Sequence, residues 1–91
     1  MDRLQAMTTF VAVVEAGGFA SAARKLDLSP PMVTRAVAEL ESRLGLRLLT
    51  RTTRMVRVTE AGARYADDCR RILAEVDEAE QAAMGEHQAP K

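Results

Sequence analysis

The sequence has few of the residues on which enzymes and metal sites are built. Its 91 residues include one cysteine, Cys69, and one histidine, His87. A disulfide within the chain needs two cysteines, and no group of residues has the spacing of metal ligands. Glu39 and Glu41 have no histidine, serine or cysteine partner for acid–base or nucleophilic chemistry. We therefore expect no enzyme activity, no bound metal and no cofactor.

Aromatic residues and long apolar runs are also scarce. Only Phe10, Phe19 and Tyr65 carry aromatic rings. Proteins that bind single-stranded nucleic acids stack bases on exposed rings, so the sequence disfavours that class. No segment approaches the length of a membrane span, and the N-terminus lacks the apolar core of a signal peptide. We expect a soluble, cytoplasmic protein with no membrane partner.

The net charge is zero, but the charges are unevenly distributed along the chain. Residues 29–57 carry six arginines against two glutamates, whereas residues 58–91 carry four basic and eight acidic groups. A basic middle segment is typical of a nucleic-acid-binding surface. The alternative is a solvated basic face, which the lack of acidic residues between positions 42 and 59 disfavours.

Residues 30–44 are predicted to form the helix that the rest of the chain positions. Ser29 is a favourable N-cap, and Pro30 and Pro31 lie in the first turn, where the amides have no helical partner to lose. Gly45 favours the left-handed conformation that ends a helix. Apolar residues recur at spacings of four, three and four, which predicts a buried stripe. They are Val33, Val37, Leu40 and Leu44.

A different face of this helix is suited to the major groove of DNA. It combines little bulk, a hydroxyl group and a forked guanidinium donor, which base recognition requires. We expect Arg35 to read guanine, with a phosphate contact as its alternative, and Ser29 and Thr34 to position phosphates. The residues of this helix that we expect to bind DNA are Ser29, Pro30, Pro31, Met32, Thr34, Arg35 and Ala38.

Two shorter helices are predicted before it. Residues 2–15 form the first, which ends at Gly17-Gly18, and residues 19–26 form the second, with a side made of small alanines. Asp27-Leu28 leaves room only for a tight turn, so the second and third helices make a helix-turn-helix. The apolar repeat of the first helix consists of Leu4, Met7, Phe10, Val11 and Val14.

After Gly45 the pattern changes to that of a strand hairpin. Residues 46–51 and 55–58 are the predicted strands, with a bend at 52–54 and with Val56 and Val58 on one face. The arginines of this hairpin would form a basic wing beside the recognition helix. We expect Arg54 to enter a minor groove, and Arg51 and Thr53 to contact DNA beside it. Arg47, Arg51 and Arg57 are expected to contact the DNA backbone or to be exposed charges, rather than to read bases.

Thr59 is predicted to cap a long final helix. Its apolar residues follow a heptad repeat, which predicts a dimer interface. A helix from 60 to 84 would be roughly 37 Å long, too long for a chain of this size to bury, so we expect a homodimer, parallel or antiparallel. Residues 85–91 would be a hinge or tail that breaks the helix at Gly85. The expected interface consists of Tyr65, Cys69, Ile72, Leu73, Val76, Ala79 and Ala83.

Several motifs occur in order over nearly the whole chain. They are residues 10–19, Ala22-Ala23 with Leu26, Leu28-Ser29, Val33-Thr34-Arg35, Leu40-Glu41, Leu44-Gly45, Leu48-Leu49, Arg51, Arg54 and residues 58–62. In this order they resemble the N-terminal DNA-binding domain of LysR-type transcriptional regulators. The resemblance implies a mainly α fold, a winged helix-turn-helix of three helices and a short β-hairpin wing, followed by a long linker or dimerisation helix.

The resemblance also implies an organisation and partners. Residues 1–58 would be the DNA-binding domain, 59–84 the linker and dimerisation helix, and 85–91 the hinge or tail. The chain would bind double-stranded promoter DNA sequence-specifically as a homodimer, with a higher oligomer in the full-length protein. A small-molecule effector would bind only a C-terminal domain, which does not follow Lys91, so we expect the chain to be a fragment.

Three departures from the family pattern concern the recognition helix. Pro30 and Ala36 occupy positions where the family often has glutamines that could bind bases. Fewer direct donors then remain, and more of the recognition falls to Thr34, Arg35 and the wing. Met32 replaces a residue that is commonly small and could touch a thymine methyl group.

A module that docks a protein partner is the alternative from another class. A protein-binding groove would expose apolar rather than basic surface. The arginine excess in residues 29–57 therefore favours DNA as the partner.

Overall fold

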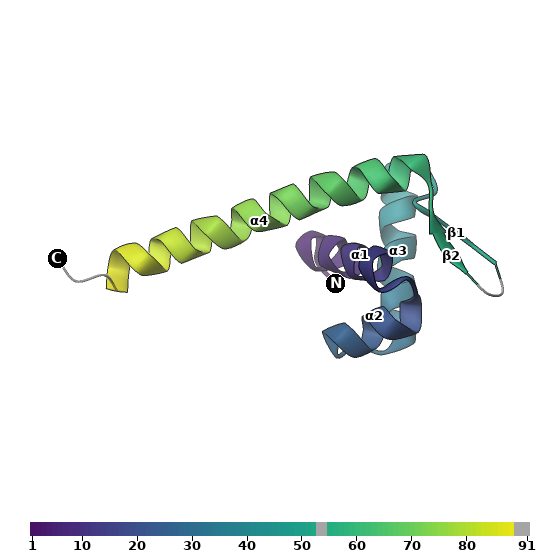
Figure 1. Cartoon of the computed structure of the whole chain (residues 1–91), viewed down its shortest axis with the longest axis horizontal. Coiled ribbons are helices and arrows are strands. Elements are labelled where there is room, and N and C mark those ends of the chain that lie inside the picture. The colour runs from purple at the N-terminus through teal and green to yellow at the C-terminus, as the bar shows by residue number, and fades with distance from the viewer. Residues whose placement is uncertain (53–54, 89–91) are drawn as a thin grey trace.

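The structure, a computed structural model, describes residues 1–52 and 55–88. Over these residues it contains four helices and one antiparallel hairpin. In chain order the elements are α1 (Arg3–Ala16), α2 (Phe19–Leu26), α3 (Pro30–Leu44), β1 (Leu49–Arg51), β2 (Val56–Val58) and α4 (Glu60–Gln88) (Figure 1). A helix-turn-helix, formed by α2 and α3, lies beside a two-stranded wing. The predicted fold class is confirmed.

The helix α3 has the bounds that its capping residues predict. The Ser29 hydroxyl accepts a hydrogen bond from the Met32 amide at 3.4 Å, and two prolines occupy the first two positions. Gly45 ends the helix at φ 72°, and its amide donates to the Glu41 carbonyl at 2.8 Å. The signals at both ends are local in sequence, which explains why they predicted both bounds.

The predicted buried stripe of α3 is confirmed in its first three members and wrong in the fourth. Val33, Val37 and Leu40 are buried, whereas Leu44 is 41% exposed because it lies in the last turn. Ala36 is buried instead, at 2% exposure, so its side chain belongs to the core rather than to a DNA-reading face.

The first helix begins at a capping box. The Asp2 carboxylate accepts from the Gln5 amide at 2.8 Å, and the Gln5 side chain accepts from the Asp2 amide at 3.2 Å. Leu4 was expected in the buried stripe but is exposed, because it lies in the first turn, at the outer end of α1. The buried surface is also wider than one stripe, since α1 contacts α2, α3 and α4. It consists of Ala6, Met7, Thr9, Phe10, Ala12 and Val13.

The two strands are shorter than predicted. They pair Leu49 with Val58 and Arg51 with Val56. Residues 46–48 do not join the sheet. The amides of Leu48 and of Leu49, the first residue of β1, donate to the Glu41 carboxylate at 2.8 and 3.1 Å. Val56 is half-buried, but Val58 is exposed, so the predicted alternation holds only for the first. Thr53 and Arg54 lie outside the described residues.

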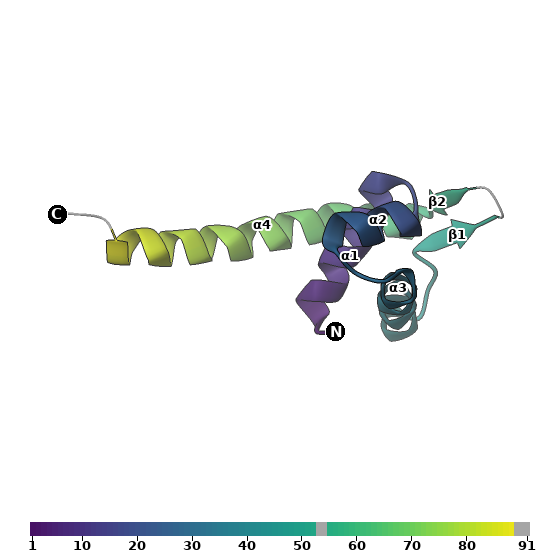
Figure 2. The same ribbon diagram turned by 90° about the horizontal axis from the view of Figure 1, so that it is seen from below.

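The last helix is longer than predicted. It runs from Glu60 to Gln88, through Gly85, so the expected break at Gly85 is wrong. A glycine inside a helix costs about 1 kcal/mol relative to alanine, which does not end a helix of this length. The second half of α4 projects far past the other helices, and the molecule measures 57 × 25 × 19 Å (Figures 1 and 2). Among the described residues, no helix has the length and apolar character to cross a membrane.

Candidate nucleic-acid interface

The outer face of α3 carries residues that were predicted from the sequence to bind DNA. Pro31, Met32, Arg35 and Ala38 are exposed, and Thr34 is half-buried. Ser29 and Pro30 are exposed at the N-terminal end. Arg35 forms no ion pair with any residue in the described part of the chain. Its guanidinium is thus available to a ligand outside the chain.

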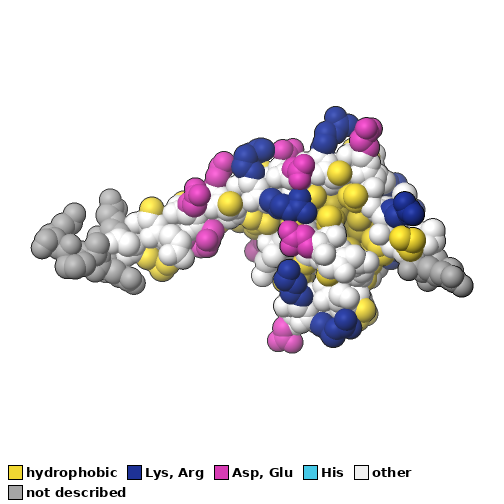
Figure 3. Space-filling view, viewed as in Figure 1, with side chains coloured by type: hydrophobic (Ala, Val, Ile, Leu, Met, Phe, Trp, Pro, Cys, Tyr) yellow, Lys and Arg dark blue, Asp and Glu magenta, His cyan; other side chains and the backbone are white. Residues whose placement is uncertain are grey.

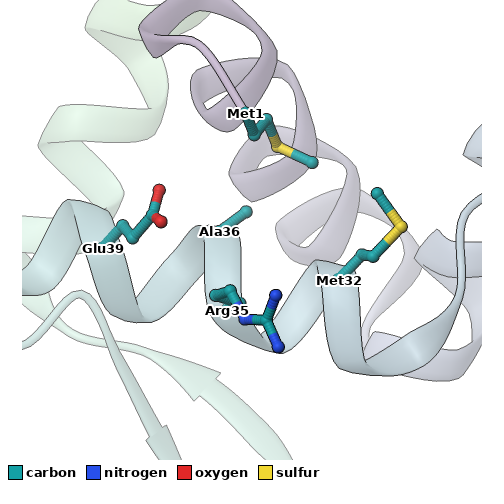
Figure 4. Close-up of a pocket in the computed structure, with 5 residues that line it drawn as sticks. All are labelled: Met1, Met32, Arg35, Ala36 and Glu39. Atoms are coloured by element: carbon teal, nitrogen blue, oxygen red, sulfur yellow. The ribbon is translucent and has the colours of Figure 1, made fainter.

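One edge of this face borders the first residue of the chain. Met1, Met32, Arg35, Ala36 and Glu39 line a hollow of about 70 Å³ (Figure 4). Figure 4 shows Ala36 directed toward α1 and Arg35 directed away from it. The hollow is too small for a cofactor. This edge separates the core, to which Ala36 belongs, from the exposed face that carries Arg35.

Ser42 also lies on this face, although the sequence did not predict it as a DNA contact. It is exposed and lies seven residues after Arg35, which is two helical turns. Its hydroxyl extends the polar face toward the C-terminal end of α3. The spacing of seven residues from Arg35 could have identified Ser42 from the sequence.

Glu41 connects the recognition helix to the wing. One oxygen of its carboxylate accepts hydrogen bonds from the Leu48 and Leu49 amides. The second oxygen lies 3.8 Å from the Arg47 guanidinium. Its side chain is only 13% exposed. The sequence did not predict this role of Glu41, because its partners reach α3 only after the chain has turned back toward that helix.

The wing arginines differ in what they contact. Arg47 faces Glu41, and the Arg57 guanidinium lies 4.0 Å from the Met55 sulfur. The Arg51 guanidinium lies over the Phe19 ring, 4.7 Å from its centroid. Arg51 was predicted as a DNA contact, and the structure places it at the end of β1 with its guanidinium over the first residue of α2. The predicted contacts Thr53 and Arg54 lie outside the described residues.

Thr59 and Gly62 fix the start of α4 against the wing. The Thr59 hydroxyl accepts from the Gly62 amide at 2.9 Å, as its predicted capping role requires, and donates to the Arg47 carbonyl at 2.8 Å. A Cβ built on Gly62 would overlap the Leu48 carbonyl oxygen. Position 62 therefore has room only for glycine.

The predicted dimer seam divides into two parts. Tyr65 packs on Phe10, with ring centroids 5.7 Å apart, and Cys69 is fully buried at 0% exposure. Cys69 offers no surface to a partner chain, so its assignment to a dimer interface is corrected, whereas that of the half-buried Tyr65 stays a prediction. Burial raises the pKa of the Cys69 thiol and of the Tyr65 phenol.

The rest of the predicted seam lies on the projecting half of α4. Ile72 is 37% exposed, Leu73 and Val76 are half-buried, and Ala79 and Ala83 are exposed. Met84 adds an exposed apolar side chain on this half. Acidic side chains gather along α4 in Figure 3, whereas most of the basic ones lie nearer the body of the molecule.

Ion pairs also join α4 to the first two helices. Arg70 contacts Glu15 at 3.1 Å and Asp67 at 2.9 Å, and Lys25 lies 3.7 Å from the other Glu15 oxygen. These side chains are substantially exposed, so their energetic contribution is small.

Comparison with known proteins identifies relatives of this chain. A family model described as "bacterial regulatory helix-turn-helix protein, lysR family" matches residues 4–63. An HTH-type transcriptional repressor of Pseudomonas aeruginosa is 47% identical over 85 residues, which are 93% of this chain and 27% of the relative. The HTH-type transcriptional activator AaeR of Escherichia coli is 45% identical over 78 residues, covering 86% of this chain and 25% of the relative.

Solved structures of similar chains include complexes with DNA. A CbnR DNA-binding domain in a DNA complex has a TM-score of 0.89 at 34% identity, covering 96% of this chain and all of that one. A BenM DNA-binding domain in complex with catB site 1 DNA has a TM-score of 0.92 at 31% identity, covering 99% of this chain and all of that one. This chain spans about a quarter of the length of the two curated relatives.

Proposed function

This chain belongs to the lysR family of bacterial regulatory helix-turn-helix proteins, and on this premise we propose that it is the sequence-specific DNA-binding domain of a transcriptional regulator. The observation that carries the proposal is the exposed face of α3, with the wing beside it and with Arg35, which has no ion-pair partner in the described part of the chain, at its centre. The DNA complexes of the similar CbnR and BenM domains support it.

In this proposal α3 enters the major groove. The Arg35 guanidinium would donate two hydrogen bonds to O6 and N7 of a guanine, the commonest specific contact of arginine. Pro31, Met32 and Ala38 would bring apolar surface to thymine methyl groups. Ser29 and Thr34 would hold phosphates and so set the register of α3 along the duplex.

The wing would follow the DNA backbone beside that groove. Figure 2 shows the hairpin and α3 at the end of the molecule away from the projecting half of α4. Arg51 would contact the backbone, and Thr53 and Arg54, at the bend, would reach the minor groove. The Glu41 contacts support this placement, because they hold β1 at a set position relative to α3.

We further propose a homodimer through the projecting half of α4, centred on Ile72, Leu73 and Val76, with Ala79 and Ala83 toward its end. The charges of α4 favour antiparallel pairing. Five of the residues from 72 to 88, in the projecting half, are acidic, whereas residues 60–71, in the half that contacts the body, carry three arginines and three acidic residues and so have no net charge. Parallel helices would place the two acidic halves side by side, whereas antiparallel helices place each acidic half beside the partner's half that has no net charge.

The remaining proposals concern the whole regulator. Because the relatives are about four times as long, we propose that an effector-binding domain follows in the full-length protein and binds a small molecule. That protein would act on promoter DNA in the cytoplasm and form a higher oligomer.

Selection of duplexes from a random pool tests the DNA-binding function. The wild-type chain should enrich one motif, and the logarithm of its affinity should fall linearly with the logarithm of salt concentration. Arg35→Ala should weaken binding to that motif by about 1–3 kcal/mol and relax the preference at one base pair per half-site. Arg71→Ala, which removes the same charge from α4, is the matched control.

The absence of any enriched motif and of salt-dependent binding would contradict the proposal and favour a module that docks proteins. Equal losses on the selected duplex and on random DNA for Arg35→Ala would instead assign Arg35 to a phosphate.

A further inference from the structure

The contact between Arg51 and Phe19 joins two elements of the proposed DNA-binding surface. Arg51 is the last residue of β1, and Phe19 is the first residue of α2. The guanidinium carbon lies 4.7 Å from the ring centroid, within the range of a cation–π contact. In the described part of the chain Arg51 has no carboxylate partner, whereas the neighbouring Arg47 faces Glu41.

The ring is itself held in place by the body of the protein. Phe19 is half-buried and packs against the hydrophobic core. A phenylalanine in this position has two uses at once, since part of its surface anchors α2 and one face supports the arginine. The support is therefore as rigid as the helix that carries it.

Stacking restricts the arginine without consuming its hydrogen-bond donors. A free arginine loses much rotamer freedom when it is fixed by a ligand, and this loss opposes binding. A guanidinium that stacks through its flat face keeps the N–H groups at its edge available. An arginine held in this way has lost part of its rotamer freedom before the ligand binds, so less is lost on binding.

We infer that Phe19 is a positioning residue, whose ring holds the Arg51 guanidinium ready to donate to a phosphate of the DNA backbone. This inference rests on the proposed DNA-binding function. A phosphate is the fitting ligand because the guanidinium is held over the Phe19 ring at the start of α2 rather than extended into a groove. Phosphates are the groups that a duplex presents along its outer edge.

The test compares substitutions at both positions on one duplex. The probe is a duplex of about 30 base pairs, recovered from a random pool by the wild-type chain and long enough for two half-sites one helical turn apart. Binding is titrated over a range of salt concentrations with wild type, Phe19→Leu, Phe19→Tyr, Arg51→Ala and the double variant Phe19→Leu with Arg51→Ala. Thermal melting of each variant separates loss of folding from loss of binding.

Arg51→Ala should lower the slope of log affinity against log salt by about one phosphate contact. Phe19→Leu, which keeps apolar bulk but removes the ring face, should weaken binding about two- to fivefold, the size of an exposed cation–π contact. Phe19→Tyr keeps the ring and should bind like wild type. In the Arg51→Ala background, Phe19→Leu should cause no further loss.

Three results would overturn the inference while leaving DNA binding intact. They are an unchanged salt slope in Arg51→Ala, losses for the two substitutions that add in the double variant, and a loss in Phe19→Tyr equal to that in Phe19→Leu. A wild-type chain that binds no duplex would instead remove the proposed function, and this inference with it.

Discussion

The two halves of α4 belong to one continuous helix but have different surroundings. In the half that begins at Glu60, Gly62, Ala66 and Cys69 are buried against the body. From Ile72 onward no described side chain is buried, although apolar residues continue at helical spacing. Helical periodicity therefore does not tell whether the chain itself covers an apolar face.

Substitution of the two glycines of α4 gives the strongest test of the difference between its two halves. Gly62→Ala should destabilise the protein by about 3 kcal/mol, because the added methyl group must displace the Leu48 carbonyl and with it the start of the wing. Gly85→Ala has open space around its Cβ and should stabilise the helix by up to about 1 kcal/mol. Denaturant unfolding of both variants measures the contrast, and effects of the same sign would contradict it.

The projecting half is tested through the oligomeric state. Ile72→Asp with Val76→Asp should give a monomer that keeps a folded body, since each chain of a dimer would have to bury two unpaired charges. The dissociation constant of the dimer should therefore rise at least about 100-fold. Sedimentation gives the mass, and hydrogen exchange should remain slow in α1 and α3. Ala74→Asp with Gln81→Asp adds the same charge to the opposite face as a control. A double variant that stays dimeric would refute the proposed interface.

A smaller effect concerns the buried thiol of the inner half. The folded pKa of Cys69 is raised by burial, so the folded state retains the proton where the unfolded thiol has begun to lose it. This contribution to stability is complete below about pH 8.5, the ordinary thiol value, and is lost as the pH rises further. Cys69→Ala should flatten the alkaline decline in melting temperature. An equal decline in both proteins would argue against it.

Thiol labelling compares the two halves directly. Wild-type Cys69 should react slowly with an alkylating reagent, because it is buried and protonated. A thiol placed on the projecting half by Ala83→Cys, in a Cys69→Ala background, should react faster when the chain is monomeric. Similar rates in the two proteins would show that Cys69 is accessible.

The smallest expected effect is that of the exposed ion pairs on the inner half. Arg70→Ala removes the contacts with Glu15 and Asp67 and should cost about 0.2–1 kcal/mol, less at high salt. Arg71→Ala, which breaks only the pair with Asp68, should cost less. Denaturant midpoints of the two variants test this order. A larger loss would mean that ion pairs, rather than the packing of Ala66 and Cys69, hold α4 to the body.

Among the site residues, those on α3 were the most predictable. The cap at Ser29, the two prolines and Gly45 act within a few residues, so they predicted the bounds of α3 and hence which side chains share a face with Arg35. Glu41 and Arg51 were not predictable in the same way. Their partners, the Leu48 and Leu49 amides and the Phe19 ring, reach them only through the folding of the hairpin onto α2 and α3.

The order of the elements, the capped ends of α3 and the basic middle segment could be predicted, because caps, periodicity and charge are local properties of a chain. Which apolar faces are covered depends instead on how the elements pack together. Leu4 and Leu44 fit their helical stripes yet lie at helix ends and remain 41% exposed. Cys69 fits a dimer seam yet is buried within its own chain, and Tyr65 packs on Phe10 of α1. Burial depends on elements that are distant in sequence, and periodicity contains no information about them.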